Sequence, residues 1–364
     1  MRESEAPQCH HGGVNDQPCT AVPDHAELAS YGWGPRWGAL AAEGVAAGLE
    51  PGIVVRHDGS AVLVATRTGV HHAGLVGSTP TVVVGDRVLV GDDVVREVLH
   101  RSSLLARRDP STGDGQPIAA NIDVVVVVCG LDRPVRPGRI ERFVTLAWEA
   151  GAVPLVVCTK VDLADVDTLA EAMAAAEAAA PGTTVVAVSA LAGSGLDELR
   201  SELADRTAVF VGESGAGKST LLNALAGDAL AATGDVRAGD AKGRHTTTAR
   251  QLHVLEGFRV IDTPGVREVG LWAGADAVDA AFGDLVEFAD RCRFRDCEHD
   301  EEPGCAVVVA VAEGQLSAER LESWHRLRRE AAAAELRADP VAARRAGKQF
   351  GRLVREAKRM KPRD

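Results

Sequence analysis

The sequence lacks any apolar run long enough to cross a membrane. Its longest runs, such as Val124 to Val128, fall far short of the roughly 20 residues that a membrane-spanning helix needs. The N-terminal stretch MRESEAPQCHHGGVNDQPC has no apolar segment behind its charges, so it does not match a secretory signal. We therefore expect a cytoplasmic protein that does not associate with membranes.

The chain also lacks an overall excess of positive charge. Its formal net charge is −12 at pH 7, which argues against indiscriminate binding of nucleic acid. The charge is uneven, because the segment from Arg320 to the end has fourteen Lys/Arg against six Asp/Glu, a local charge of +8. A basic end on an acidic body is typical of a protein that docks on a polyanion through that end, and a solvated helix face is the alternative.

Cysteine is scarce and unevenly placed. Three of the seven cysteines fall within fourteen residues, a spacing that in a cytoplasmic chain favours a metal site over disulfides. Three thiolates and one imidazole form a closed tetrahedral set, which suits one structural Zn²⁺ per chain and leaves no position for catalytic water. The predicted ligands are Cys292, Cys297, His299 and Cys305. The N-terminal Cys9, His10, His11 and Cys19 lack compact ligand spacing, so we favour no metal there.

A chain of 364 residues with 46% hydrophobic residues has room for two or three domains. We predict a tail and lead-in over residues 1–45, a barrel over 46–110, an α/β domain over 111–272 and a helical zinc-binding domain with a basic tail over 273–364. From Gly52 onward, short β-branched runs separated by Gly, Asp and Ser turns predict an OB-like β-barrel, a fold that often binds oligonucleotides.

Strands and helices alternate after the segment RRDPSTGDGQP, Arg107 to Pro117, whose composition predicts a linker. Apolar strand segments such as IDVVVVVCG, VPLVVCTK and TTVVAVSA are each followed by a helical pattern. This alternation predicts a parallel, doubly wound α/β sheet. After Trp272 the chain is expected to be mainly helical.

The segment GESGAGKST matches the phosphate-loop pattern G-x-x-x-x-G-K-[ST], with a predicted strand before it and a helix after it. Backbone N–H groups of such a loop surround the phosphates, and the helix N-terminus adds partial positive charge. We expect Lys218 to reach the β and γ phosphates and Ser219 to ligate Mg²⁺. The whole predicted loop comprises Gly212, Glu213, Ser214, Gly215, Ala216, Gly217, Lys218, Ser219 and Thr220.

Two further segments predict contacts with magnesium and the γ-phosphate. In DTPG, Asp262 is the expected carboxylate on the magnesium side, and Gly265 is the expected backbone donor to a γ-phosphate. Between this segment and the phosphate loop lies GRHTTT, where a switch loop would supply a threonine to Mg²⁺. We favour Thr247, with Thr246 and Thr248 as alternatives.

The segment TKVD, formed by Thr159, Lys160, Val161 and Asp162, resembles the element that reads guanine in GTPases. A carboxylate at Asp162 accepts hydrogen bonds from N1–H and the exocyclic amine of guanine, whereas adenine has no N1–H, so ATP should be rejected. Asn is usual where this chain has Thr159, which predicts some loss of affinity or of loop bracing. SALAGSG begins with Ser189 and Ala190, and the backbone N–H of Ala190 is expected to contact the guanine oxygen.

These elements occur in an unusual order, because TKVD and SALAGSG precede the phosphate loop, the HTTT segment and DTPG. The order is that of a GTPase cut before its base-reading motif and rejoined. Such a circular permutation is tolerated where the original termini lie close together on the surface. The sequence therefore predicts a circularly permuted P-loop GTPase that binds GTP and Mg²⁺.

With this motif order the chain resembles the ribosome small-subunit-dependent GTPase A family (RsgA, also called YjeQ). The resemblance rests on YGWGPRW, VGDRV, the permuted motifs, GRHTTT, DTPGVRE and CRFRDCEHDEEPGC, and it spans residues from about 28 to 364. It implies an N-terminal OB domain, a permuted GTPase centre, and a C-terminal zinc domain that uses the same four ligands. It also implies GTP hydrolysis stimulated by the small ribosomal subunit.

We therefore expect a monomeric GTPase that docks on the maturing small ribosomal subunit and its rRNA through the barrel and the basic C-terminus. Hydrolysis without the subunit should be slow, because Val266 stands where many GTPases carry a water-positioning Gln. The family resemblance makes His245 the candidate substitute. The alternative is a GTP-controlled RNA-binding scaffold or checkpoint, for which turnover matters little.

Overall fold

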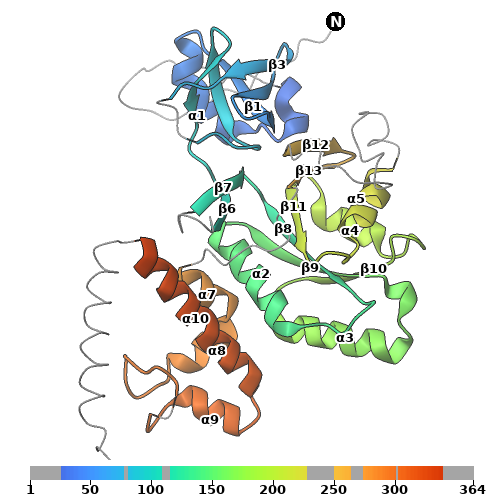
Figure 1. Ribbon diagram of the computed structural model, residues 1–364, viewed down its shortest axis with the longest axis vertical. Coiled ribbons are helices and arrows are strands. Elements are labelled where there is room, and N and C mark those ends of the chain that lie inside the picture. Colours follow the sequence, from blue (N-terminus) through green and yellow to red (C-terminus); the bar gives the residue numbers. More distant parts are fainter. Residues whose placement is uncertain are drawn as a thin grey trace, which may run out of the picture.

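The computed structural model consists of a β-barrel, a mixed sheet with helices on both faces, and a helical C-terminal part (Figure 1). Among the helices it describes, none combines the length and the apolar character that crossing a bilayer demands. The described residues are 26–77, 81–108, 115–227, 250–263, 274–300 and 302–338.

The N-terminal barrel has five strands. Strand β1 pairs with both β2 and β4, and β5 pairs with β4 and β3, so the sheet closes on itself. Its interior is filled by small branched side chains, including Val54, Val64 and Val88. The predicted OB-like barrel is confirmed. Its strands are β1 (Glu50–His57), β2 (Ala61–Thr66), β3 (Gly69–Gly74), β4 (Arg87–Gly91) and β5 (Val94–Val98), preceded by a 3-10 helix (Ala26–Tyr31) and helix α1 (Pro35–Ala46).

A β-hairpin follows the barrel where the composition suggested a linker. Strands β6 (Leu104–Arg108) and β7 (Gly115–Ala120) pair antiparallel, with Arg107 opposite Gln116 and Ala106 opposite Pro117. In its described part the segment is therefore strand, and the linker interpretation was wrong there. The apolar residues Leu105 and Ile118, both fully buried, hold the hairpin in the core, and the polar composition of the turn hid this.

The central sheet has the strand order β10-β9-β8-β11-β13-β12, in which the first five strands are parallel and β12 is antiparallel. Successive valines of β8 point to opposite faces, so Val125 packs under α2 and α3 while Val126 packs with α4 and α5. The predicted doubly wound sheet is confirmed. Its strands are β8 (Val124–Gly130), β9 (Val153–Thr159), β10 (Val185–Val188), β11 (Thr207–Gly212), β12 (Gln251–Leu255) and β13 (Phe258–Asp262), and its helices are α2 (Pro137–Glu149), α3 (Val166–Ala179), α4 (Leu196–Leu203) and α5 (Lys218–Ala226); a 3-10 turn spans Val161–Leu163.

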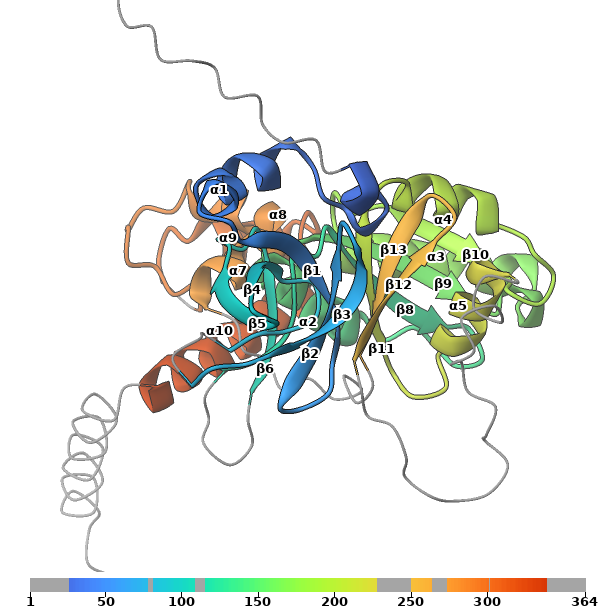
Figure 2. The same ribbon diagram turned by 90° about the horizontal axis from the view of Figure 1, so that it is seen from above.

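One strand joins the barrel to the central sheet. Strand β12 pairs antiparallel with β1, with Gln251 opposite Arg56, so barrel and sheet are connected by hydrogen bonds. Figure 2 shows β12 and β13 lying beside the barrel strands. Strand β12 pairs in turn with β13, which ends at Asp262, so paired strands connect the barrel to a predicted site residue.

The C-terminal part is helical, as predicted, and packs on the central domain through α2 (Figure 1). Arg320 joins these parts, because its guanidinium forms two 2.6 Å hydrogen bonds with Asp284 and lies 3.4 Å from a carboxylate oxygen of Glu141 on α2. The helices are α7 (Ala275–Ala281), α8 (Gly283–Ala289), α9 (Ala306–Ala312) and α10 (Ala318–Ala338).

Candidate nucleotide site and metal centre

The nucleotide-binding motifs meet at one edge of the central sheet. Strands β9, β10, β11 and β13 are parallel, so their carboxyl ends face the same way. TKVD begins at the end of β9, SALAGSG follows β10, the phosphate loop follows β11, and Asp262 ends β13. Ligands of open α/β sheets bind outside the carboxyl ends of the strands, so the motifs lie where a nucleotide site is expected.

The phosphate loop requires glycine at both of its ends. Gly212 has φ 143°, and a β-carbon there would lie 2.3 Å from the carbonyl oxygen of Val128. Gly217 has φ 90° and immediately precedes α5, so the loop ends at a helix N-terminus. Lys218 begins α5, and its ammonium donates to the carbonyls of Gly212 (2.7 Å) and Glu213 (2.6 Å). The lysine charge is thereby held over the loop, with Ser219 next to it in the first helical turn.

Thr159 braces the phosphate loop from the base-reading motif. It is buried, and its hydroxyl donates to the carbonyl of Ala216 at 2.6 Å; the carbonyl of Cys129 lies 3.3 Å away. A side chain shorter than Asn thus still makes a connection between the two motifs. Some bracing of the loop is therefore present with Thr159, and the expected loss relative to Asn stays a prediction.

Lys160 makes a second connection to the phosphate loop. Its backbone is left-handed (φ 61°), and its ammonium donates to the carbonyl of Gly215 (2.7 Å) and pairs with Asp132 (2.9 Å). The hydrogen bond from Lys160 is the main cause that holds the pKa of Asp132 below its ordinary value. The sequence analysis missed Asp132. It could have been predicted from its position, because it follows β8 closely and so lies at the same edge of the sheet.

Ser189 orients the predicted base-reading carboxylate. The fully buried Ser189 hydroxyl donates a short hydrogen bond to Asp162, and the backbone N–H of Ala192 donates to the same hydroxyl at 3.0 Å. Asp162 itself is exposed, in the 3-10 turn that also contains Val161. Ala190 follows Ser189 directly after β10. A fixed and accessible carboxylate is what the reading of a base edge requires.

Three arginines surround Glu213 of the phosphate loop, and the sequence analysis missed them. The carboxylate of Glu213 lies 2.6 Å from Arg139, 3.6 Å from Arg133 and 3.9 Å from Arg136. The arginines recur every third residue, from Arg133 in the loop before α2 to Arg139 in its first turn, and this spacing is the signal that would have predicted them. They neutralise a negative charge that would otherwise stand beside bound phosphates.

Part of the predicted site cannot be placed. His245, Thr246, Thr247, Thr248, Gly265 and Val266 lie outside the described residues, as do residues 341–364 and the N-terminal Cys/His segment. Asp262 is described, at the end of β13 and half-buried. The roles of the undescribed residues stay predictions.

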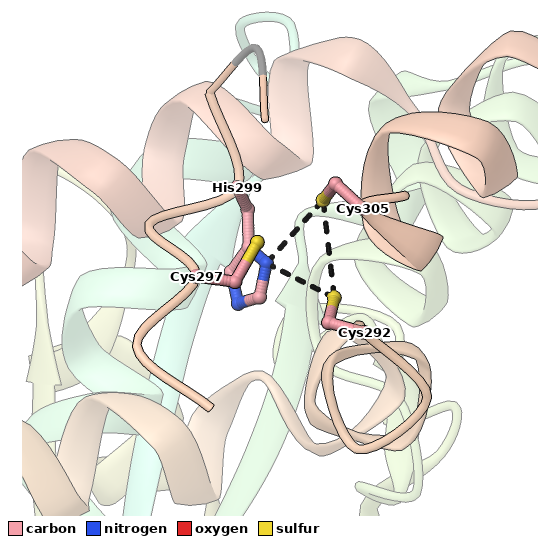
Figure 3. Close-up of side chains that lie close together, drawn as sticks. All are labelled: Cys292, Cys297, His299 and Cys305. Carbon is pink, nitrogen blue, oxygen red and sulfur yellow. Dashed lines mark hydrogen bonds between the residues drawn. The ribbon is translucent and has the colours of Figure 1, made fainter. Parts of the chain in front are cut away.

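The four predicted metal ligands converge on one point in the C-terminal part (Figure 3). The Nδ1 atom of His299 lies 3.5 Å from the sulfur atoms of Cys292 and Cys305, which are 3.9 Å apart, and all four ligand atoms lie within 4.8 Å of one another. Tetrahedral zinc, with bonds of about 2.3 Å to sulfur and about 2.0 Å to nitrogen, would separate two sulfurs by about 3.8 Å and sulfur from nitrogen by about 3.5 Å. The donor set and its spacing therefore fit zinc.

Backbone donors and the N-terminus of a helix lie beside these ligands and favour the charged thiolate form that binds a cation. The backbone N–H of Ala306 donates to the sulfur of Cys292 (3.3 Å), and that of Val308 donates to the sulfur of Cys305 (3.4 Å). Both donors belong to the first turn of α9, whose N-terminus favours thiolate charge. The His299 ring lies against Trp324, with the ring centroids 5.4 Å apart. The cluster is partly buried and has the character of a structural site.

The strand order, the phosphate loop and the placement of TKVD before it define a circularly permuted P-loop GTPase. The family model "RsgA GTPase" matches residues 98–272. The "Small ribosomal subunit biogenesis GTPase RsgA" of Streptomyces coelicolor is 44% identical over 92% of this chain and 97% of its own length. A protein of the same name from Vibrio parahaemolyticus, RsgA 2, is 40% identical over 83% of this chain and 84% of its own length. The chain belongs to the RsgA GTPase family and is a GTPase.

Solved structures agree with this assignment. The crystal structure of YjeQ from Thermotoga maritima covers 78% of this chain and 98% of that protein, with a TM-score of 0.59 and 28% identity. YloQ, described as a circularly permuted GTPase, covers 78% of this chain and 96% of its own, with a TM-score of 0.59; at 24% identity it supports the fold alone. An "ABC transporter" model also matches residues 202–351, a range that contains the phosphate loop common to both classes.

Proposed function

We propose that this GTPase acts in the late maturation of the small ribosomal subunit. It binds the maturing subunit and its rRNA through the barrel and the basic C-terminus, hydrolyses GTP there, and then leaves. The observation that carries the proposal is the 44% identity, over 92% of the chain, to a protein named for small-subunit biogenesis. We propose further that the protein works as a monomer in the cytoplasm, where ribosomes are assembled.

In this proposal the edge of the central sheet binds GTP with Mg²⁺. Lys218 binds the β and γ phosphates, the loop N–H groups from Gly212 to Thr220 surround them, and Asp162 reads guanine, assisted by Ala190. Mg²⁺ would be held by Ser219 and Asp262, a hydroxyl and a carboxylate that suit its preference for oxygen ligands, and by Thr247. Bound there, the ion would neutralise charge on the phosphates.

The Cys/His cluster binds one structural zinc in this proposal. The support is the chemistry and spacing of the donors, together with backbone donors to two of the sulfurs. Because binding energy at a structural site is folding energy, zinc would stabilise the loop that connects α8 to α9.

The proposal expects slow hydrolysis by the free protein. Val266 cannot orient a water molecule, and His245 of the switch segment is the proposed substitute. The subunit would stimulate turnover by holding His245 where it can orient the attacking water, which completes the site.

Sedimentation with purified subunits tests the proposed partner. We expect the protein to pellet with small subunits in a non-hydrolysable GTP analogue, to pellet less in GDP, and to stay in the supernatant with large subunits. The matched control is Lys218→Ala, which should lose the difference between the nucleotides. Equal association with both subunits would contradict the proposal.

The alternative function is a GTP-controlled RNA scaffold, for which binding matters and turnover does not. A variant that binds GTP but does not hydrolyse it separates the two, and His245→Ala is the first choice. If cells that carry this variant still mature small subunits at the parental rate, the scaffold is the better account.

A further inference from the structure

A polar cavity lies between the barrel, the central sheet and the turn before α1, away from the nucleotide-binding edge. Its volume is about 320 Å³, within the range of small-molecule sites. Its walls come from Trp33 and Trp37 near α1, Arg87 of β4, and the residues at the amino ends of the central strands, Asp123, Thr207 and Arg259. Residues from well-separated parts of the chain therefore line one polar, partly open space.

Two guanidinium groups converge at this cavity. A β-carbon placed on Gly32 would lie 2.9 Å from Nη2 of Arg87 and 3.0 Å from Nε of Arg259, so both groups border the same small volume. Both arginines are buried, with exposed fractions of 2% and 8%. Two like charges held together out of water repel each other and need compensation by negative charge.

The protein supplies negative charge through Asp123 and Asp205 in the cavity wall, but it leaves one donor of Arg87 unpaired. Arg87 donates to the carbonyls of Gly85 (2.6 Å) and Gly32 (3.0 Å), but its buried Nε has no hydrogen-bond partner among the described residues. Burial, together with the charge of Arg259, lowers the pKa of Arg87 to about 10 in spite of Asp123. The guanidinium of Arg87 keeps a donor that nothing described in the protein accepts.

Several other polar groups of the cavity are already engaged. Arg259 donates from Nε to the hydroxyl of Thr207 (3.2 Å) and from Nη2 to the carbonyl of Asp205. The carboxylate of Asp123 accepts from the backbone N–H of Thr207 at 2.7 Å. Asp123 thus serves the strand as well as the arginines, and an anion in the cavity would add acceptors beside the guanidinium groups that border it.

We propose that this cavity is a second ligand site, distinct from the GTP site, and that it takes a small organic or inorganic anion whose carboxylate or phosphate group lies between Arg87 and Arg259. Arginine suits both groups, because its planar donors match their oxygen atoms. Trp33 and Trp37 form the apolar side of the cavity against which the rest of such a ligand would pack.

The position of the cavity gives the ligand a regulatory role. Thr207 begins the strand that ends at Gly212 of the phosphate loop, and five residues at about 3.3 Å each separate the two sites by roughly 16 Å. Arg259 lies on β13, which ends at Asp262, whereas Arg87 belongs to the barrel. An anion that bridges these arginines would join the barrel to the GTPase sheet and so couple to nucleotide binding.

Tryptophan fluorescence and calorimetry on the full-length protein test this site directly. The protein is first saturated with GDP and Mg²⁺, so that the phosphate loop is filled, and is then titrated with phosphate, sulfate, citrate or acetate. We expect saturable binding of at least one anion, with a fluorescence change that is lost in Trp37→Phe and kept in Trp148→Phe, whose indole lies outside the cavity. A comparison of the affinities for citrate and for phosphate shows whether the site prefers a carboxylate or a phosphate group.

The decisive variants are Arg259→Gln and the matched Arg206→Gln, which removes an exposed arginine that is not in the cavity wall. Arg259→Gln should weaken anion binding at least tenfold and Arg206→Gln should leave it unchanged. If Arg259→Gln folds poorly, Arg259→Lys is used in its place. The lysine variant keeps the positive charge but lacks the planar donors of arginine. Binding that is insensitive to Arg259, or no saturable binding of any of the four anions, would overturn the proposal.

Discussion

The hydroxyl of Thr159 donates a 2.6 Å hydrogen bond to the carbonyl of Ala216, and this bond joins the base-reading motif to the phosphate loop. The two residues are far apart in the chain, and their order is the reverse of the usual one. They meet because β9 and β11 are parallel strands of one sheet that end at the same edge. Circular permutation changes the connections between strands and leaves their arrangement in space unchanged.

This contact predicts the effect of changing Thr159. Thr159→Val keeps the shape and removes the hydroxyl, which leaves the buried carbonyl of Ala216 without its donor at a cost of about 1 kcal/mol. We expect GTP and GDP to bind about fivefold more weakly, whereas Thr159→Asn should bind close to the parent. Calorimetric titration with both nucleotides is the measurement. An unchanged affinity in the valine variant would show that the loop does not need this brace.

Base selectivity should depend on Asp162 and, to a smaller degree, on Ser189. Asp162→Asn replaces a double acceptor by a mixed group, so the preference for GTP over ATP should fall roughly a hundredfold or more. Ser189→Ala removes one hydrogen bond to the carboxylate and should reduce the preference only severalfold. The measurement is a binding assay in which GTP and ATP compete for each variant, and it gives the preference for GTP directly. If both variants discriminate as the parent does, guanine is read elsewhere.

The sequence predicted the motifs better than the contacts between them. Short local patterns located the phosphate loop, the TKVD segment and the metal ligands, because each depends on residue type and spacing within a few positions. Asp132 and the arginines around Glu213 were not predicted, since Asp132 pairs with Lys160 and the arginines pair with Glu213, residues that are distant in the chain. Such contacts follow from the strand order, which a local pattern does not contain.

The hairpin and the cavity were not predicted from the sequence, for a related reason. Polar and glycine-rich residues around Arg107 to Pro117 indicated a linker, yet a hairpin forms there and buries Leu105 and Ile118, which lie just outside that segment. The cavity between Arg87 and Arg259 combines residues from the barrel and from the central sheet. Arg87 belongs to the VGDRV motif and Arg259 to no motif that we identified, and nothing local to either residue predicts that they meet, so only the packing of the two parts shows them together.

Zinc content tests the metal centre. We expect one tightly held zinc per chain in purified protein, and loss of that zinc when Cys292, Cys297 and His299 are all changed to Ala. The same change should unfold the C-terminal part, because the metal supplies its folding energy. Cys158→Ala, which removes a buried thiol in β9, is the control and should keep the zinc. Zinc that persists in the triple variant would refute the assignment.

Two arginines of α10 offer a matched comparison for the contact between the C-terminal part and the central domain. Arg320→Ala leaves Glu141 and Asp284 without their buried partner, and we expect it to cost about 3–5 kcal/mol in the free energy of unfolding. Arg328→Ala breaks a half-exposed pair with Asp279 and should cost about 1 kcal/mol or less. Urea unfolding measures both. Equal costs would mean that Arg320 does not hold the two parts together.

The rate of GTP hydrolysis with and without small ribosomal subunits tests the central claim most directly. Purified protein is assayed alone, with small subunits, and with large subunits, at the same GTP concentration and salt, with Lys218→Ala as the inactive control. We predict slow turnover alone, a large increase with small subunits, and no increase with large subunits. Turnover that is unaffected by small subunits, or raised equally by both, would contradict the account.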